Sequence, residues 1–223
     1  MAISHVNIAI DGPAGAGKST AARGLADALN IHILDSGALF RAFALRALRR
    51  GADLTDADAV EKALDGATLD IKAEADGQRT ILDGEDVSQA IRTPEVAAGA
   101  SAIGAIPYVR NVLTQQVRKI AAQLSVVVDG RDIGTAMLPQ ADFKFFLTAT
   151  PEERARRRYE EQREKGNEQP YEEVLQGIKK RDHFDANRSI APLKQAQDAF
   201  VIDSTEMDAE SVIATMLSII EGK

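Results

Sequence analysis

The segment Gly12-Pro13-Ala14-Gly15-Ala16-Gly17-Lys18-Ser19 constrains the fold more than any other part of the chain. A glycine, four further residues and then Gly-Lys-Ser form the spacing of a P-loop, which joins a buried strand to the helix after it. An apolar run over 6–10 precedes the segment, and a helical pattern over 19–29 follows it. Backbone N–H groups of closely spaced glycines can converge on phosphate oxygens, and the helix start adds positive potential. We therefore expect an α/β fold that binds a nucleoside triphosphate.

Within this loop, Lys18 has the length to reach the terminal phosphates, and the Ser19 hydroxyl can bind a Mg²⁺ ion that bridges them. The residues expected to contact ATP here are Gly12, Pro13, Ala14, Gly15, Ala16, Gly17, Lys18, Ser19 and Thr20. A glycine-rich turn that happens to precede a helix is the alternative, but all four fixed positions of the motif are present. The same loop serves motors, switches and metabolite kinases, so other segments must decide its use.

The rest of the chain alternates between strand and helix patterns. Apolar runs at 31–34, 126–128, 143–147 and 200–202 predict four more buried parallel strands, and helical patterns occupy 39–48, a stretch from Glu152, and 209–220. This alternation predicts a five-stranded parallel sheet flanked by helices.

Two regions interrupt the alternation. Between 55 and 106, a helix with Thr55 as its cap and a β-hairpin of 68–73 and 79–82 around Asp76-Gly77 predict an insertion. Residues 151–188 contain ten basic and ten acidic side chains and few apolar ones, which predicts a mobile, solvated helical arm.

Charged and polar residues follow the second and third predicted strands. Because the carboxyl ends of parallel strands meet at one edge of a sheet, these residues should lie beside the P-loop. We expect Asp129 to accept a hydrogen bond from a magnesium-bound water and Arg131 to hold a phosphate. For Arg41 and Arg131, a surface ion pair with a neighbouring aspartate is the alternative. The residues are Asp35, Ser36, Gly37 and Arg41 after the second strand, and Asp129, Gly130, Arg131 and Asp132 after the third.

The charged arm adds two clusters. Arg154, Arg157 and Arg158 lie together on one predicted helix, where they either reach the phosphates or form screened surface pairs with nearby glutamates. Arg181, Asp185 and Arg188 follow at i, i+4 and i+7, a spacing that places them on one helical stripe, facing a ligand or pairing with one another.

Composition limits the partners of the chain. A net charge of −7 disfavours nucleic acid and anionic lipid, the N-terminal segment predicts neither a signal peptide nor a membrane span, and the absence of cysteine suits a reducing cytoplasm. With 7 Phe, 3 Tyr and no Trp, a large aromatic interface is not expected, which favours a monomer.

A collinear series of segments resembles the bacterial cytidylate kinase family from the P-loop almost to the C-terminus. The segments are Ile10-Asp11-Gly12-Pro13, Leu34-Asp35-Ser36-Gly37-Ala38, Gly84-Glu85-Asp86-Val87-Ser88 with Ile91-Arg92, Asp129-Gly130-Arg131-Asp132-Ile133-Gly134-Thr135, Asn187-Arg188-Ser189-Ile190-Ala191-Pro192-Leu193 and Asp203-Ser204-Thr205. The resemblance implies a core domain of 1–35, 105–150 and 189–223. It further implies a lobe of 36–104 that binds a nucleoside monophosphate and carries a small antiparallel sheet, and a helical lid of 151–188.

The resemblance also implies residue roles. Lys18, Arg131 and Arg158 would be catalytic, and Arg154 and Arg157 would bind ATP. Arg41 and Arg131 would hold the phosphate of the monophosphate, Ser101, Arg110, Asp132 and Arg188 would surround cytosine, and Arg181 and Asp185 would contact the sugar. Ser36 and Gly37 would also bind CMP. Phe40, Phe184 and Ala186 depart from residues common in the family and affect fine contacts.

The expected reaction is transfer of the γ-phosphoryl group of ATP to CMP, and also to dCMP, with Mg²⁺. One alternative is a kinase of another small metabolite, shikimate-like or dephospho-coenzyme-A-like. The other is a nucleotide-driven switch, although the chain has no Asn-Lys-x-Asp segment that would read guanine. The residues alone do not separate CMP from UMP.

Overall fold

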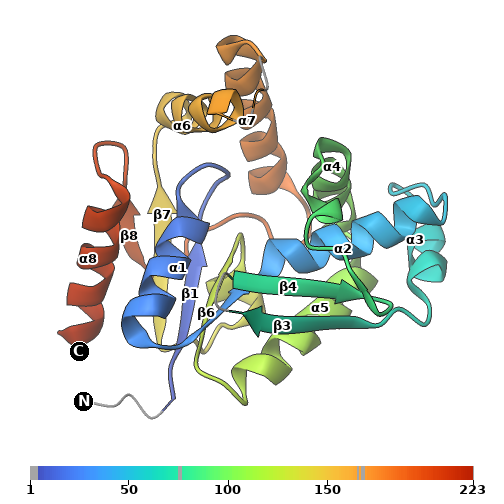
Figure 1. Ribbon diagram of the computed structural model, residues 1–223, viewed down its shortest axis with the longest axis horizontal. Helices are drawn as coiled ribbons and strands as arrows, with labels where there is room; N and C mark the ends of the chain where they lie inside the picture. The colour runs from blue at the N-terminus through green and yellow to red at the C-terminus, as the bar shows by residue number, and fades with distance from the viewer. Residues whose placement is uncertain (1–4, 75–76, 165, 167–168, 223) are drawn as a thin grey trace.

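A five-stranded parallel sheet forms the centre of the computed structural model, which describes residues 5–74, 77–164, 166 and 169–222. Its strands lie in the order β2-β6-β1-β7-β8 (Figure 1). Their bounds are β1 (Asn7–Asp11), β2 (His32–Asp35), β6 (Val126–Gly130), β7 (Phe143–Thr148) and β8 (Phe200–Asp203). All neighbouring pairs are parallel, so the predicted α/β architecture is confirmed.

The two faces of the sheet are covered by different helices, because successive strand residues point to opposite sides. Ile8 and Ile10 pack with α1 (Lys18–Leu29) and α8 (Ala209–Glu221). Ala9 faces the other core, which contains α2 (Ser36–Arg49), α4 (Pro94–Ile103) and α5 (Pro107–Ala121). The end of β1 that leads into the P-loop therefore lies between two packed layers.

The inserted region contains more regular structure than the sequence patterns indicated. The helix α3 (Ala57–Leu64) is capped by Asp56, whose side chain accepts from two backbone amides, so the prediction of Thr55 as its cap was wrong. The hairpin is confirmed as β3 (Leu69–Glu74) and β4 (Gly77–Leu82), and a short third strand β5 (Glu85–Asp86) extends it. The predicted turn residue Asp76 lies outside the described residues.

Helices α4 and α5 had not been predicted. Apolar residues surround much of α4, so its sequence lacks the one-sided apolar pattern of an amphipathic helix. A signal for both helices was nevertheless present, because Pro94 and Pro107 stand in the first turns of α4 and α5, where proline is favoured. Among the described residues, no single helix is long and apolar enough to span a membrane, although α4 and α5 together, bent by 98° at their junction, have sufficient length and apolar content.

The charged arm consists of α6 (Pro151–Glu164) and α7 (Tyr171–Asn187), and Figure 1 shows it above the ends of β1 and β7. A small core of its own, formed by Ala155, Val174, Leu175 and Ile178, joins the two helices. Arg188 lies just beyond α7 with an extended backbone, so the predicted helical stripe ends before it.

Candidate functional site

The P-loop packs tightly against the end of β7. A Cβ atom on Gly12, whose φ is 150°, would lie 1.9 Å from the carbonyl oxygen of Leu147. Gly15 and Gly17 also have positive φ angles, of 79° and 87°. These conformations favour glycine, and Gly17 leads directly into the first turn of α1. The local backbone therefore has the form that a phosphate-binding loop requires.

Lys18 is buried within this loop, where its Nζ donates to the Pro13 carbonyl at 2.7 Å. Burial lowers the pKa of Lys18 well below its ordinary value, and the positive charge of Arg131 lowers it further, ahead of the opposing effect of Asp129. The positive charge of Arg181 also contributes to the lowering. A cation held among other cations is stabilised by an anionic ligand.

Ser19 and Asp129 meet at the carboxyl end of β6. The Ser19 hydroxyl donates to Asp129 Oδ2 at 2.7 Å, whereas Asp129 Oδ1 is buried and has no hydrogen-bond partner. Burial and the nearby negative charge of Asp35 raise the pKa of Asp129 to about 6. A hydroxyl beside an unpartnered carboxylate oxygen fits the oxygen ligands and bound waters of Mg²⁺. Among the described residues, no group of three acidic or histidine side chains could hold a metal alone, so nucleotide phosphates would have to complete the site.

Asp129→Asn should raise the melting temperature at about pH 8 and leave it nearly unchanged at about pH 4. The pKa of about 6 exceeds the ordinary 3.8, so the folded protein binds this proton more tightly than the unfolded chain. The free energy of unfolding therefore falls as the pH rises from about 4 to about 6, and above that range the ionised, buried carboxyl carries its full cost. Asparagine removes that cost and retains an oxygen for Ser19. Thermal unfolding in the absence of nucleotide measures the effect.

Asp53→Asn is a control of opposite sign. Asp53 is exposed, and the Thr55 amide and then the Thr55 hydroxyl lower its pKa, so its ionised form stabilises the fold above about pH 4. This variant should be less stable than the parent protein at about pH 8. Equal shifts of melting temperature at both pH values for Asp129→Asn would contradict the role of ionisation.

The residues predicted to bind the acceptor begin where β2 enters α2. Asp35 caps α2 through the amide of Ala38 at 3.0 Å and accepts from Arg41 at 2.7 Å. The ion pair that was the alternative for Arg41 is thus present, at the carboxyl edge of the sheet. The Ser36 hydroxyl donates to the carbonyl of Asp129 at 2.7 Å and joins the ends of β2 and β6. For Arg131, the partner is Asp185 on α7, at 2.8 Å, rather than Asp132.

Asp132 forms the centre of a buried charge cluster. It accepts from Arg110 on α5 and from Arg188, the latter at 2.8 Å. Two guanidinium groups share one carboxylate, so the cluster has a net positive charge, and all three side chains are buried from solvent. Arg110 also lies 5.7 Å from the centre of the Phe40 ring. Ser101 is half-buried on α4, and its hydroxyl bonds within that helix to Ala97.

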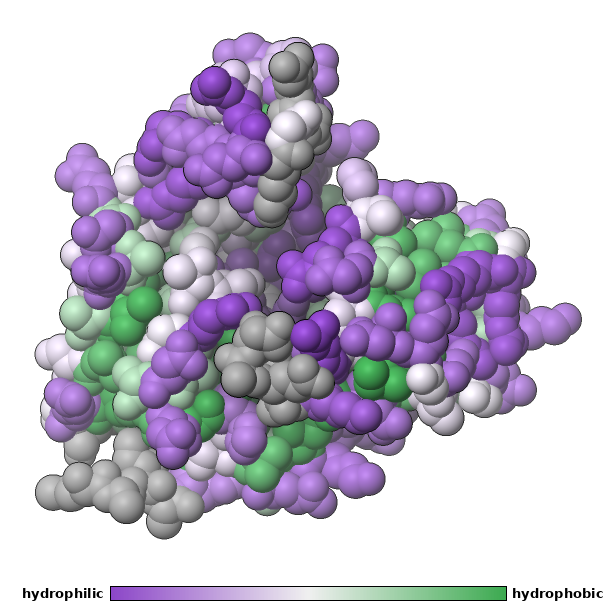
Figure 2. Space-filling view, in the orientation of Figure 1, coloured by the Kyte–Doolittle hydropathy of each residue, from purple (hydrophilic) through white to green (hydrophobic). Residues whose placement is uncertain are grey.

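Three other guanidinium groups act electrostatically on Arg181 of α7. The pKa of Arg181 is lowered to about 10, first by partial loss of hydration and then by the positive charge of Arg131, with Arg41 and Arg158 adding to the effect. The Arg181 side chain is still 41% exposed, so solvent screens these charges. Asp185 opposes this shift from 4.0 Å away. Arg131 also lowers the pKa of Lys18, so the segment after β6 and the P-loop are close enough for their charges to interact. Figure 2 shows a hydrophilic recess between the arm and the core.

The three arginines of α6 have different surroundings. Arg154 is buried; it donates to the P-loop carbonyl of Ala14 at 3.0 Å and to both oxygens of Asp182. Arg157 donates to the carbonyl of Ser204 at 2.6 Å. The side chain of Arg158 is 53% exposed and pairs with a glutamate on its own helix, so the structure does not bring it into contact with the P-loop.

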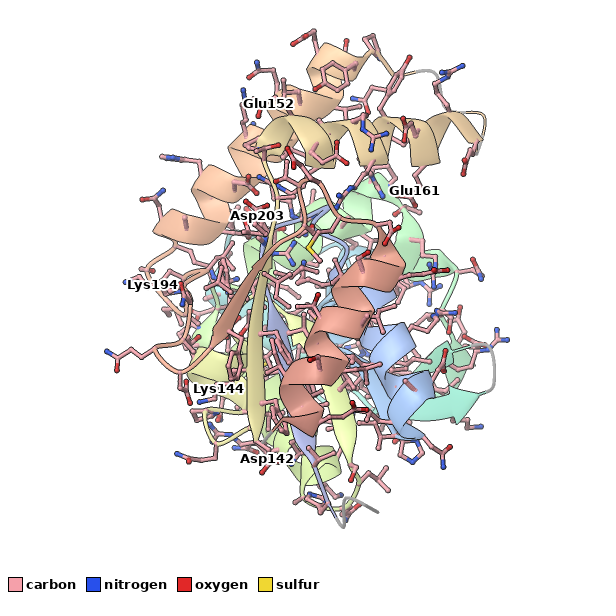
Figure 3. All side chains as sticks on the ribbon, turned by 90° about the vertical axis from the view of Figure 1, so that its left-hand side faces the viewer. Asp142, Lys144, Glu152, Glu161, Lys194 and Asp203 are labelled. Atoms are coloured by element: carbon pink, nitrogen blue, oxygen red, sulfur yellow. The ribbon has the colours of Figure 1, made fainter. Side chains whose placement is uncertain are left out.

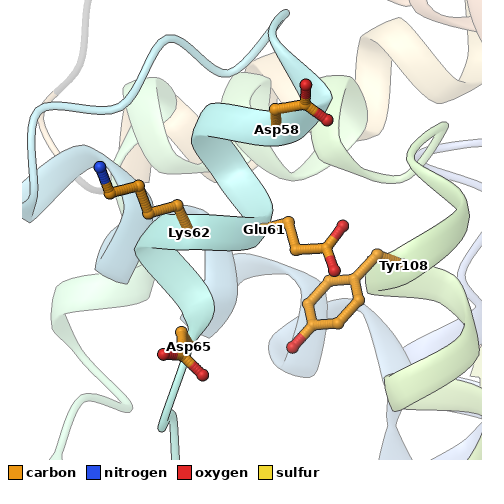
Figure 4. A pocket seen from close by; sticks show the side chains of 5 residues that line it. All are labelled: Asp58, Glu61, Lys62, Asp65 and Tyr108. Atoms are coloured by element: carbon orange, nitrogen blue, oxygen red, sulfur yellow. The ribbon is translucent and has the colours of Figure 1, made fainter.

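A cavity of 510 Å³ adjoins the P-loop, between the starts of α1 and α8. Gly17, Thr20, Leu147, Arg157, Thr205 and Val212 are among its lining residues. Figure 3 shows Asp203 at the end of β8. The loop that follows it, from Ser204 to Asp208, lines this cavity. A separate cavity of 330 Å³ lies at α3, lined by Asp58, Glu61, Lys62, Asp65 and Tyr108, and contains none of the residues predicted for the site (Figure 4).

Three further residues support the site but had no role in the sequence analysis. Asp11 accepts from two backbone amides beyond Asp132, and Gln78 on β4 accepts from the Asp35 amide at 2.8 Å. Thr205 lines the larger cavity. Asp11 and Thr205 belong to segments that carried the family resemblance, so that signal was available, whereas nothing in the sequence marked Gln78.

Comparison with known proteins gives one consistent family. A family model described as cytidylate kinase matches residues 8–222. A cytidylate kinase of Caldanaerobacter subterraneus subsp. tengcongensis is 50% identical over 208 residues, which cover 93% of this chain and 91% of that protein. A cytidylate kinase of Carboxydothermus hydrogenoformans is 46% identical over 218 residues and 98% of both proteins. Among solved structures, the shikimate kinase of Bacteroides thetaiotaomicron superimposes on this chain with a TM-score of 0.52 and 16% sequence identity. The match covers 97% of this chain and 98% of the shikimate kinase, and it shows that the two proteins share a fold.

Proposed function

The chain belongs to the cytidylate kinase family, and we propose how its residues carry out the phosphorylation of CMP by ATP. The reaction moves the γ-phosphoryl group of ATP to the phosphate of CMP and yields ADP and CDP. The observation that carries the proposal is geometric: Lys18 lies in the P-loop, and Arg131, which follows β6 at the same edge of the sheet, binds Asp185 on α7 at 2.8 Å, with Arg181 4.0 Å from the same carboxylate. Cations on both sides of the transferred group offset the repulsion between the two anionic substrates and help to align them.

The donor triphosphate binds to residues 12–20. Backbone amides of the loop hold the phosphate oxygens, and Lys18 stabilises the charge of the group in transfer. We assign the nucleoside end of ATP to the 510 Å³ cavity, which begins at Gly17 and Thr20 and so adjoins the phosphate loop. Arg154 and Arg157 support this side from α6, because they bond to carbonyls of the P-loop and of the loop after β8.

The acceptor monophosphate binds on the other side of Arg131. Arg41 and Arg131 hold its phosphate together with Ser36 and Gly37, and the two-cation cluster around Asp132 lies deeper, toward the base, with Ser101 on α4 beside it. Arg181 and Asp185 on α7 contact the sugar. The CMP phosphate is already a competent nucleophile at neutral pH, so no covalent intermediate on the protein is required.

Mg²⁺ fits the pair formed by Ser19 and Asp129. When bound, the ion would neutralise negative charge on the phosphates of ATP. The Ser19 hydroxyl would be a direct ligand, and the unpartnered Oδ1 of Asp129 would accept from a water on the ion. Asp129 therefore orients the metal site without having to supply a second direct ligand.

The core, the monophosphate lobe of 36–104 and the lid of 151–188 are assigned in the same way. The lid would exclude water from the transferred group, and Arg158 would act as a catalytic residue only after movement of α6 toward the phosphates. The absence of cysteine and the net charge of −7 support a monomer that acts in the cytoplasm.

A single assay tests the acceptor, the metal and the alternatives together. ADP release should be rapid with CMP, present with dCMP, and negligible with shikimate or with no acceptor. It should stop on chelation of divalent cations and return with Mg²⁺. UMP and AMP complete the panel. Rapid turnover of shikimate, or ATP hydrolysis without any acceptor, would contradict the proposal.

A further inference from the structure

Asp11 lies at the point where the donor and acceptor segments meet. It is the last residue of β1, directly before Gly12, and it pairs in the sheet with Gly130, directly before Arg131. Its side chain is buried. One carboxylate oxygen accepts from the amide of Ile133 at 2.7 Å, and the other accepts from the amide of Gly134 at 2.7 Å.

These two amides open the π-helical turn Ile133–Met137, so the carboxylate fixes the direction in which the chain leaves Asp132. The turn is tight: a Cβ atom on Gly130 would lie 2.6 Å from the Ile133 side chain and 2.8 Å from the Ser36 hydroxyl. A displacement at Ile133 would therefore be transmitted to Arg131 and Asp132, which project from the same short segment.

The pKa of the Asp11 carboxyl depends on charged groups of both the donor and the acceptor segments. Burial raises its pKa to about 6, and the amides of Gly134 and Ile133 oppose that rise. The charges of Asp132, on the acceptor side, and of Lys18, on the donor side, also influence this pKa. Near pH 8 the group is ionised and both oxygens act as charge-assisted acceptors, the stronger type of hydrogen bond.

We propose that Asp11 is a positioning residue for the acceptor, which aligns Arg131 and Asp132 with the P-loop by holding the amides of Ile133 and Gly134. This inference rests on the proposed acceptor role of residues 131–132. Asp11 would therefore affect the binding of CMP, although it belongs to β1, the strand that leads into the P-loop.

Asp11→Asn tests this role with little change in shape. The amide group keeps one acceptor oxygen but turns an N–H donor toward a backbone N–H, so one charge-assisted bond is lost. The KM for CMP should rise about 10- to 100-fold, the range expected for one hydrogen bond to a charged group. The KM for ATP should change much less, because the backbone of the P-loop is left intact.

Asp142→Asn is a matched control at the opposite end of the same strand. Asp142 accepts from the backbone amide of Asn7, the first residue of β1, at 2.8 Å, and Figure 3 shows it at the end of the sheet away from the arm. Its replacement should lower the melting temperature and leave both KM values unchanged. The same loss of CMP affinity in both variants, or equal rises of both KM values in Asp11→Asn, would overturn the proposal.

Two additions separate the remaining outcomes. If Asp11→Asn does not unfold cooperatively, Asp11→Glu replaces it in the test. Glutamate keeps the charge and both oxygens but is one methylene longer, so this variant should show the same selective rise in the KM for CMP. No such rise would overturn the role of Asp11. Arg131→Ala in the same assay tests the proposed acceptor site itself. A parent-like KM and kcat for Arg131→Ala would refute that site, whereas an effect of Arg131→Ala with none of Asp11→Asn would refute the inference alone.

Discussion

Arg131→Ala should lower kcat for the phosphorylation of CMP by about 10³-fold or more, as expected for an arginine that stabilises a phosphoryl group in transfer. The physical reason is its position, since Arg131 acts electrostatically on Lys18 of the donor loop and on Arg181 of the acceptor side. Steady-state kinetics with ATP and CMP measure the effect. Arg131→Lys should restore little, because lysine lacks the planar fork that binds two phosphate oxygens.

The loss of Arg131 also leaves the buried Asp185 without its 2.8 Å partner, so part of the effect could come from instability. The double variant Arg131→Ala/Asp185→Ala removes that unpaired carboxylate, and should recover stability without recovering kcat. Arg49→Ala is the control for loss of an arginine ion pair, because Arg49 makes two bonds to Glu85 on an exposed surface. It should leave kcat unchanged. A double variant that regains activity would show that Arg131 is structural.

Lys18→Met should reduce kcat/KM by at least about 10²- to 10³-fold, the effect of removing one preorganised charge from a catalytic site. The folded protein should nevertheless be as stable as its parent, or more so. Burial lowers the pKa of Lys18, which means that the fold disfavours its charged form, and methionine fills a similar volume without a charge. Thermal unfolding without nucleotide, beside the kinetics, measures both parts.

Lys144→Met is a close match for this experiment. Lys144 is also buried, and its Nζ donates to a proline carbonyl five residues before it in sequence, as that of Lys18 does; it also pairs with Asp198 at 2.6 Å. Its replacement should lower stability, because the ion pair is lost, and should leave kcat/KM intact. A large fall in the melting temperature of Lys18→Met with most activity retained would contradict the assignment of Lys18.

The parallel core could be predicted because its strands are short apolar runs that must be buried, and because the P-loop fixes the order strand, loop, helix. The third strand of the small sheet could not, since Glu85 and Asp86 are exposed and their pairing with β4 is set by the hairpin rather than by apolar residues. The helix α4 was not predicted for the opposite reason: it is apolar on several sides and so shows no amphipathic pattern.

The sequence indicated which residues lie near the P-loop but not which residues they pair with. Spacing placed Arg41 and Arg131 near the phosphate loop, but Arg131 pairs with Asp185, which lies 54 residues away in sequence. Such a pairing depends on how the arm packs over the core, and local patterns contain no information about it. The same limit applies to Arg157, whose carbonyl partner in Ser204 is brought near only by the pairing of β7 with β8.

Aspartates already pair with guanidinium groups that are proposed to bind the nucleotides. Arg41, Arg131 and Arg188 each hold a carboxylate at 2.7–2.8 Å. An incoming phosphate is attracted by these cations but must also displace the internal carboxylates that they already hold. We expect free inorganic phosphate to displace these carboxylates poorly, because it lacks a base and a sugar to add contacts. A nucleotide that supplies those contacts is expected to displace them, so the internal ion pairs would favour nucleotides over small anions.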